Sequence, residues 1–217
     1  PSDATVTTAK LASTSVTAAK LNNDIISGST ELASEPADTD EFLVSDAGTL
    51  KRIDYSLIKG GGITEADMWR LTTTITGTNG DITANLERVD DASFAKIGTG
   101  VTPSSGIFSF PSTGLYLIGS MISINFSNQA DNNTNVIVKA TINNSDYDEI
   151  SYIAAGSNSS SGNSRFSVFK QNYLNVTNTS NVKVKFTTGS MESGSSVVGD
   201  SNKNMTAFSF IRLGDSQ

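Results

Sequence analysis

Three clusters of carboxylates are the candidates for chemistry in this sequence, which contains no histidine and no cysteine. The clusters are Asp38/Asp40, Glu87/Asp90/Asp91 and Asp146/Asp148/Glu149. Two carboxylates can hydrolyse a glycosidic bond, so cleavage of a polysaccharide stays open. The missing residue types exclude the commonest general base, the most potent side-chain nucleophile and a Ser-His-Asp triad. Polar turn residues explain the last cluster without catalysis, and we expect no enzyme.

The last cluster is also the candidate for a metal ion. Ca²⁺ prefers oxygen ligands, which Asp146, Asp148 and Glu149 could supply. The spacing lacks the Asp-x-Asp-x-Asp-Gly loop, and the absence of cysteine excludes thiolate sites and disulfides. We therefore expect neither a metal nor a cofactor.

The composition indicates a β protein with long polar loops. Charged residues make up 17% and aromatic residues 7% of the chain, whereas Ser, Thr, Asn and Gly are abundant. The formal net charge is −7 and the basic residues are scattered, so nucleic acid, which requires clustered positive charge, is not an expected partner. No apolar run approaches the roughly 18–20 residues that span a bilayer, so we expect no membrane insertion.

The fold is organised around residues 106–126, which predict two apolar strands joined by a Pro-Ser-Thr-Gly corner. A strand that faces water on one side should alternate apolar and polar residues. The second strand is apolar at even and odd positions near its start. One face can pack inside a β-sandwich, and the other face then requires cover, for which another subunit is the plausible source.

Residues 106–118 resemble the central signature of the tumour-necrosis-factor and complement globular-head family, roughly Gly-x-Phe-x-x-Pro-x-x-Gly-x-Tyr-x-Φ. Residues 205–213 resemble the closing strand of that family, and the similarity spans roughly residues 68–215. The resemblance implies a ten-stranded antiparallel jelly-roll sandwich that assembles as a compact trimer. Such domains are usually binding heads on a stalk.

The alternation of the two central strands predicts which side chains meet the trimer axis. The predicted trimer contacts of this domain, the knob, are Leu115, Leu117, Ala207, Ile211 and Leu213. The opposite parity, which includes Tyr116 and Phe208, then fills the core of each subunit. The reverse assignment remains an alternative at this stage.

The N-terminal residues 1–30 contain a ten-residue repeat, Val-Thr-x-Ala-Lys-Leu. Its large apolar residues recur every five positions, a spacing that fits neither a helix nor a strand. These residues, predicted to stack on the trimer axis of an extended stem, are Val6, Leu11, Val16, Leu21 and Ile26. A disordered Ser/Thr/Ala linker is the alternative. The repeat resembles units common in bacteriophage fibre proteins.

Residues 31–62 predict a small β module that ends in a glycine hinge. Residues 41–46 and 49–55 read as two strands that reverse at Ala47-Gly48. One hairpin is marginal by itself, so trimerisation would supply its missing contacts. The string at residues 37–46 resembles a module of phage tail fibres. The knob then covers residues 63–217.

Three long polar segments, residues 127–135, 154–164 and 189–204, alternate with short connections and should lie at one end of the sandwich. Binding commonly resides in long loops on a rigid scaffold. The candidate receptor-facing residues are Asn128, Asp131, Asn133, Asn158, Asn163, Glu192, Asp200 and Asn202. Tolerated surface insertions are the alternative.

Three aromatic residues have two interpretations each. Trp69 either anchors the knob to the stem below the trimer axis or belongs to the core. Tyr147 and Tyr152 could stack on a sugar, although core packing is the favoured interpretation for Tyr152.

Together these features predict a non-enzymatic, trimeric fibre or spike protein of a bacteriophage. Its N-terminus would attach to other virion proteins, and its knob would bind a host-surface molecule such as a glycan. The chain shows no export signal, and Pro1 would follow a removed initiator Met, so we expect synthesis in the host cytoplasm and a place on the virion surface. The alternatives are a capsid decoration or head-fibre protein and a depolymerase of surface polysaccharide.

Overall fold

The computed structural model describes residues 27–59 and 62–217, which fall into two compact units divided at residues 60 and 61. Each unit is treated by itself. Apart from one helical turn, every labelled element in both units is a β-strand. Within the described residues, no helix is both long and apolar enough to cross a bilayer. The predicted stem residues, from Val6 to Ile26, lie outside the described part of the chain.

The N-terminal unit is the predicted hairpin. Strands β1 (Glu41–Asp46) and β2 (Thr49–Asp54) pair antiparallel, with Phe42 opposite Ile53. Ala47 and Gly48 make the reversal with φ values of 48° and 83°, a left-handed pair that suits a two-residue hairpin loop. The helical turn α2 (Tyr55–Ile58) follows directly.

The knob, residues 62–217, is an antiparallel sandwich of a six-stranded and a seven-stranded sheet. The resemblance implied ten strands; the higher number arises because six of the strands have only two or three residues. The strands of the knob are β3 (Ala66–Leu71), β4 (Ile75–Thr76), β5 (Gly80–Asp81), β6 (Leu86–Arg88), β7 (Thr102–Ser104), β8 (Ile107–Ser109), β9 (Gly114–Ser127), β10 (Asp131–Thr141), β11 (Asp148–Ser157), β12 (Asn163–Val176), β13 (Lys183–Gly189), β14 (Ser195–Val197) and β15 (Ala207–Gly214).

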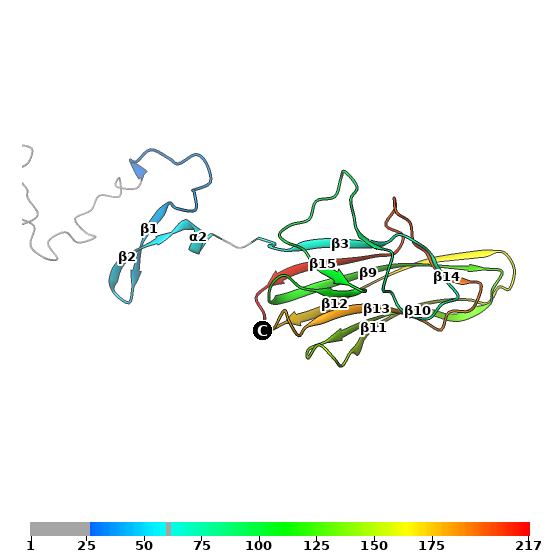
Figure 1. Ribbon diagram of the computed structural model, residues 1–217. Coiled ribbons are helices and arrows are strands. Elements are labelled where there is room, and N and C mark those ends of the chain that lie inside the picture. Colours follow the sequence, from blue (N-terminus) through cyan, green and yellow to red (C-terminus); the bar gives the residue numbers. More distant parts are fainter. Residues whose placement is uncertain (1–26, 60–61) are drawn as a thin grey trace, which may run out of the picture. The chain divides into compact units, whose positions relative to one another are not determined.

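Strand β9 is the centre of the seven-stranded sheet, which has the order β4-β14-β9-β15-β3-β6 with β12 on the other side of β9. Both β14 and β15 pair with the same edge of β9, one with each half. The six-stranded sheet has the order β11-β10-β13-β8-β7, and β5 also pairs with β13. Figure 1 shows the two sheets as stacked layers.

The parity predicted for the core is the one that the structure shows. Tyr116, Ile118, Phe208 and Phe210 are all at most 1% exposed and belong to one apolar cluster between the sheets. Four phenylalanines form its centre, with Phe186 stacked on Phe208 at 3.5 Å between ring centroids and Phe108 at 5.1 Å from Phe210. Buried aromatic side chains at these spacings provide much of the stability of such a core.

The structure requires glycine at position 106, the first residue of the signature stretch. Its φ is 78°, and a Cβ at this position would collide with the carbonyl oxygen of Ile82. Only glycine therefore lets the turn before β8 pass so close to the segment that follows β5.

All three predicted long loops are shorter than expected. Strand β11 reaches Ser157 and β12 begins at Asn163, so residues 158–162 connect them. Strand β9 reaches Ser127 and β10 begins at Asp131, so only residues 128–130 connect them. Residues 189–204 are interrupted by β14. Polar residues concealed the start of β10 and of β14, because the buried residues there include Asp131, Thr134 and Ser195.

Candidate assembly and binding surfaces

The outward face of the seven-stranded sheet, here called the outer face, carries every knob residue that was predicted to meet the trimer axis. Leu115 and Leu117 project from β9, on the side opposite the buried Tyr116 and Ile118. On β15, Ile211 is partly exposed and Leu213 is 49% exposed, whereas Ala207 is 4% exposed. The structure brings these five residues onto one surface, and their role in a trimer remains a prediction.

Strand β12 extends the outer face with two aromatic side chains that the sequence analysis did not single out. Phe169 is 58% exposed and lies opposite Met121 of β9; Tyr173 is 69% exposed and lies opposite Leu117. The signal was present in the sequence, because Val168 and Leu174 occupy the inward parity and leave positions 169 and 173 outside. The polar residues between them masked the alternation.

A hollow of about 140 Å³ lies in the middle of the outer face. Met68, Met121, Phe169 and Ala207 provide its apolar lining, and Asn204 also lines it. The Oδ1 atom of Asn204 is buried and accepts no hydrogen bond from the described residues. A surface of this kind is well suited to apolar contact with another protein surface.

The outward face of the six-stranded sheet, here called the charged face, has the opposite character. Two of its lysines form ion pairs along the strands, Lys185 with Asp81 at 2.8 Å and Lys139 with Glu149 at 3.2 Å. The Lys185 ammonium also lies 4.3 Å from the centroid of the Tyr147 ring. One face of that ring is therefore occupied, which disfavours the interpretation of Tyr147 as a sugar platform.

Tyr152, on β11, is 42% exposed, so the expectation of core packing is wrong for this residue. Its hydroxyl donates to Oδ1 of Asn133 at 2.7 Å and accepts from Nδ2 of Asn135 at 2.9 Å. The exposed ring therefore has a fixed position next to the amide of Asn133, on the side of the sandwich where the charged face lies.

Three connections meet at the end of the sandwich where β9 finishes, and this end is called the tip. Residues 128–130 and 158–162 are joined by the Asn128 amide, which donates to the Gly162 carbonyl at 2.8 Å. The third connection, residues 190–194, joins them through the Ser127 amide and the Gly194 carbonyl at 2.9 Å. The predicted convergence of alternate connections is thus observed for these three segments.

Asp131, which was predicted to face a receptor, instead points into the protein and is 5% exposed. Its carboxylate accepts hydrogen bonds from the hydroxyls of Thr134 and Ser195 and from the backbone amides of Asn133 and Glu192. Burial acts to raise the pKa of this carboxyl, but the hydrogen bonds outweigh it and the pKa lies below the ordinary value. Because Asp131 belongs to β10 and Ser195 to β14, this carboxylate ties the two sheets together at the tip.

The other predicted receptor-facing residues divide into two places. Asn128, Asn133, Asn158, Asn163 and Glu192 are exposed at or beside the tip. Asp200 and Asn202 lie elsewhere, between β14 and β15, where the Asp200 amide donates to the Leu71 carbonyl. The prediction that they share one surface with the other six is therefore wrong, because β14 interrupts the segment.

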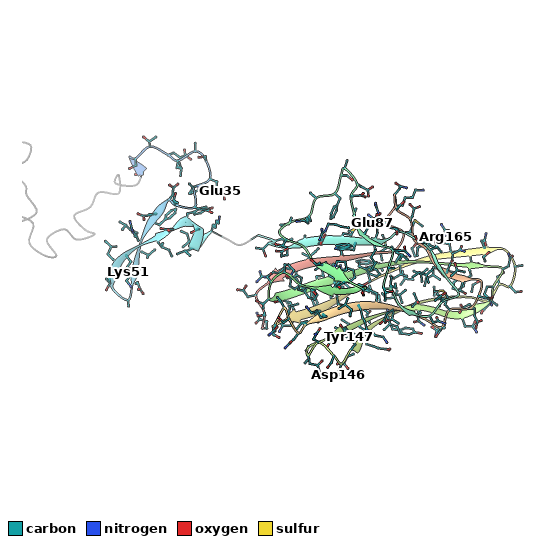
Figure 2. All side chains as sticks on the ribbon, in the orientation of Figure 1. Glu35, Lys51, Glu87, Asp146, Tyr147 and Arg165 are labelled. Carbon is teal, nitrogen blue, oxygen red and sulfur yellow. The ribbon has the colours of Figure 1, made fainter. Side chains whose placement is uncertain are left out.

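Structural partners account for the carboxylate clusters of the knob. Arg70, whose side chain is 1% exposed, binds Glu87, Asp90 and Asp91 at 2.7, 2.5 and 2.9 Å. Asp146 accepts from the Asn143 side chain at the turn after β10. Figure 2 shows Glu87 and Asp146 on opposite sides of the sandwich. Within the described residues, no acidic cluster has the arrangement of a metal site.

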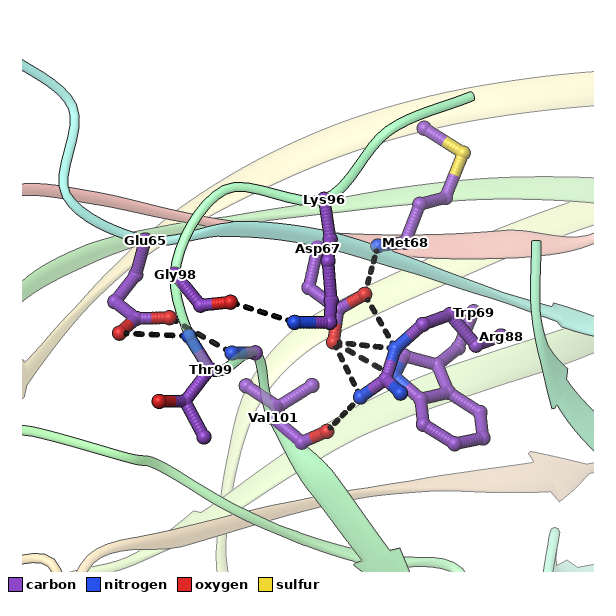
Figure 3. Close-up of polar contacts among 10 residues, drawn as sticks. Glu65, Asp67, Met68, Trp69, Arg88, Lys96, Gly98, Thr99 and Val101 are labelled. Carbon is purple, nitrogen blue, oxygen red and sulfur yellow. Dashed lines mark hydrogen bonds and ion pairs between the residues drawn. The ribbon is translucent and has the colours of Figure 1, made fainter. Parts of the chain in front are cut away.

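Trp69 belongs to the packing of the first strand. Its indole lies edge-on to Phe108 at 5.9 Å and donates to the buried carboxylate of Asp67 at 3.1 Å. Arg88 binds the same carboxylate at 3.0 Å and covers the indole ring (Figure 3). These contacts favour the core interpretation over an anchor below the trimer axis.

The two ends of the knob meet at the end opposite the tip, here called the base. Arg212 donates to the Thr64 side chain at 3.3 Å and, through its backbone amide, to the Glu65 carbonyl at 2.9 Å. The chain therefore enters the knob beside Leu213, at the start of β9. The tip and the chain entry therefore lie at opposite ends of the knob, and binding at the tip remains a prediction.

No protein-family model matches this chain, and no curated protein matches its sequence. Solved structures do match. The structure of the Eiger TNF from S. frugiperda aligns with a TM-score of 0.53 and 13% identity, over 72% of this chain and 96% of that one. The knob has a tumour-necrosis-factor-like jelly-roll fold. At this identity the likeness concerns the fold alone.

Two further structures align over similar lengths with lower scores. Murine APRIL at pH 8.0 gives a TM-score of 0.48 and 11% identity, over 69% of this chain and 98% of that one. PRD1 vertex protein P5 gives 0.40 and 19% identity, over 71% of this chain and all of that one.

Proposed function

We propose that this chain is a non-enzymatic, trimeric fibre or spike protein of a bacteriophage virion. Its N-terminal segment attaches to other virion proteins, and the tip of its knob binds a host-surface molecule. Binding of each knob is weak, and several sites on one trimer and several trimers on one particle raise the overall avidity.

The apolar outer face is the observation that supports assembly into trimers. Five or more apolar side chains from β9, β12 and β15 lie on this face of the knob, including Phe169 at 58% and Tyr173 at 69% exposure. Large exposed apolar patches mark interaction surfaces. Jelly rolls of this fold typically form trimers, and copies packed around a threefold axis cover such a face.

The proposed virion location rests on the N-terminal sequence. The Val-Thr-x-Ala-Lys-Leu repeat and the module at residues 37–46 both resemble parts of phage fibre proteins. The knob supports this arrangement because its chain entry at Thr64 lies at the base, which leaves the tip free of the attachment.

The test is binding of the labelled full chain to a panel of bacterial strains. A receptor-binding knob gives saturable binding to one or a few strains and protects those cells from a phage that carries the protein. An enzyme would release new reducing ends from capsular polysaccharide, and we expect none.

Decoration of the capsid is the second candidate, and the short tip favours it. Residues 128–130 are only a tight turn, and the Asp131 carboxylate is used internally, so the tip offers less adaptable surface than the sequence suggested. A decorating protein would bind no strain in the same assay and would leave infection unchanged.

A further inference from the structure

The N-terminal unit, residues 27–59, has no core of its own. None of these residues is buried. The exposed apolar side chains are Leu32, Phe42, Leu43, Leu50, Leu57 and Ile58, with exposures between 40% and 74%. A two-stranded hairpin is at best marginally stable in water, so this unit must obtain apolar contacts from outside itself.

The two faces of the hairpin are covered to different degrees. Phe42 and Ile53 share one face, and the Tyr55 ring lies 6.1 Å from the Phe42 ring across it. Leu43 and Leu50 share the opposite face, with exposures of 74% and 69%. This second face, here called the leucine face, leaves its large apolar side chains more exposed than the first face does.

The basic residues of the unit are Lys51, Arg52 and Lys59, and each forms an ion pair within it, with Asp46, Glu41 and Asp38. The pair of Arg52 and Glu41 lies on the leucine face together with Asp54, because Arg52 is opposite Leu43 and Asp54 is opposite Glu41. The two leucines are the apolar part of this face, and they suit contact with another apolar surface.

A second copy of the chain is the best-matched occupant. Only residues 60 and 61 separate this unit from the knob in the sequence. If knobs assemble through the outer face, each trimer holds three hairpins at a high effective concentration. Three identical leucine faces can then cover one another. One surface of a different protein would not cover all three.

We propose that residues 41–54 are an assembly module in which the leucine faces of the copies, Leu43 and Leu50, pack against one another. The inference rests on the proposed trimer and goes beyond it, because it assigns the self-association of this unit to one face of one hairpin. The module then holds the copies together on the N-terminal side of the knob, and does not serve only as a spacer.

Cysteine cross-linking tests the proposal, since the chain contains no cysteine. Leu50→Cys places a thiol on the leucine face of the full chain, and Leu57→Cys is the control, at 69% and 74% exposure respectively. Under mild oxidation we expect Leu50→Cys to form interchain disulfides at least ~10-fold faster than Leu57→Cys, at a rate independent of protein concentration.

Hydrogen exchange of the same full chain gives the second measurement. We expect the β1 and β2 amides to exchange at least ~100-fold more slowly than unstructured amides, with protection lost in Leu43→Asp and kept in Leu57→Asp. Equal cross-linking of both cysteines, or rapid exchange, in a chain that sediments as a trimer would overturn the assembly module while the trimer stands. A chain that sediments as a monomer would overturn both.

Discussion

The two outward faces of the knob differ in a way that their inward faces do not. Both sheets contribute apolar side chains to one core, for example Ile118 from the seven-stranded sheet and Val184 from the six-stranded sheet. Outside, the charged face has paired lysines such as Lys185, whereas the outer face has Phe169 and Tyr173. Folding of a single subunit therefore explains the charged face and leaves the outer face unexplained.

This difference separates residues that stabilise the subunit from residues that assemble it. A side chain between the sheets gains its burial when one chain folds. In the proposed trimer, a side chain on the outer face gains most of its burial when copies meet, so substitutions there should change assembly much more than folding.

The largest expected effect is loss of assembly in Leu117→Asp. The new carboxylate would lie unpaired at the subunit contact, where desolvation costs several kcal/mol, so dissociation should occur at concentrations at least ~100-fold higher than for the wild type. Ile137→Asp is the matched control, because Ile137 is a partly exposed apolar residue on the charged face. Sedimentation equilibrium of both variants measures the effect.

Equal weakening by Leu117→Asp and Ile137→Asp would break the comparison, since it would place both faces at subunit contacts. Unchanged assembly in both variants would show that the outer face is not a subunit contact.

The second effect is a loss of stability without a loss of assembly, in Asp131→Ala. The substitution leaves four donors from two sheets without their buried acceptor. We expect the free energy of unfolding to fall by about 2–4 kcal/mol in urea titrations. Asp146→Ala, at an exposed turn, should change it by less than ~0.5 kcal/mol. Dissociation of the Asp131 variant into folded monomers would contradict this separation.

The same carboxylate gives a pH dependence. Because the pKa of Asp131 is lowered in the folded protein, the unfolded chain binds the proton first as the pH falls. Its contribution is complete above the ordinary carboxyl pKa and is lost as the pH falls through the folded pKa. From pH 7 to pH 2, the free energy of unfolding should therefore fall more steeply in the wild type than in Asp131→Asn. Near neutrality the free energy of unfolding should depend on pH equally in both proteins.

The smallest effect is expected on the charged face. Lys139→Met removes the partner of Glu149, which is 56% exposed. Exposed ion pairs contribute little, so the free energy of unfolding should change by less than ~0.5 kcal/mol and the trimer should persist. A larger loss that disappears in high salt would show that the ion pairs of this face stabilise the knob more than the account allows.

The sequence predicted elements whose apolar residues alternate clearly. The hairpin at residues 41–54 and the parity of Tyr116 and Phe208 are confirmed, because strand period and turn chemistry agree at these places. The antiparallel jelly-roll class is confirmed as well, on the resemblance of the signature stretch.

The tip was the poorly predicted part. Asp131 was placed outside because residues 127–135 were predicted to be a long polar loop, and the four donors that compensate its burial come from segments up to 64 residues away. Local pattern carries no information about such partners. Phe169 and Tyr173 were missed because polar residues masked the alternation of β12, and the pairing of β12 with β9 places them beside Met121 and Leu117.

Sedimentation equilibrium of the full wild-type chain at micromolar concentration tests the central claim most directly. The account predicts one species with three times the mass of the 22.8 kDa chain. A well-folded monomer, with Phe169 and Tyr173 open to water, would contradict it.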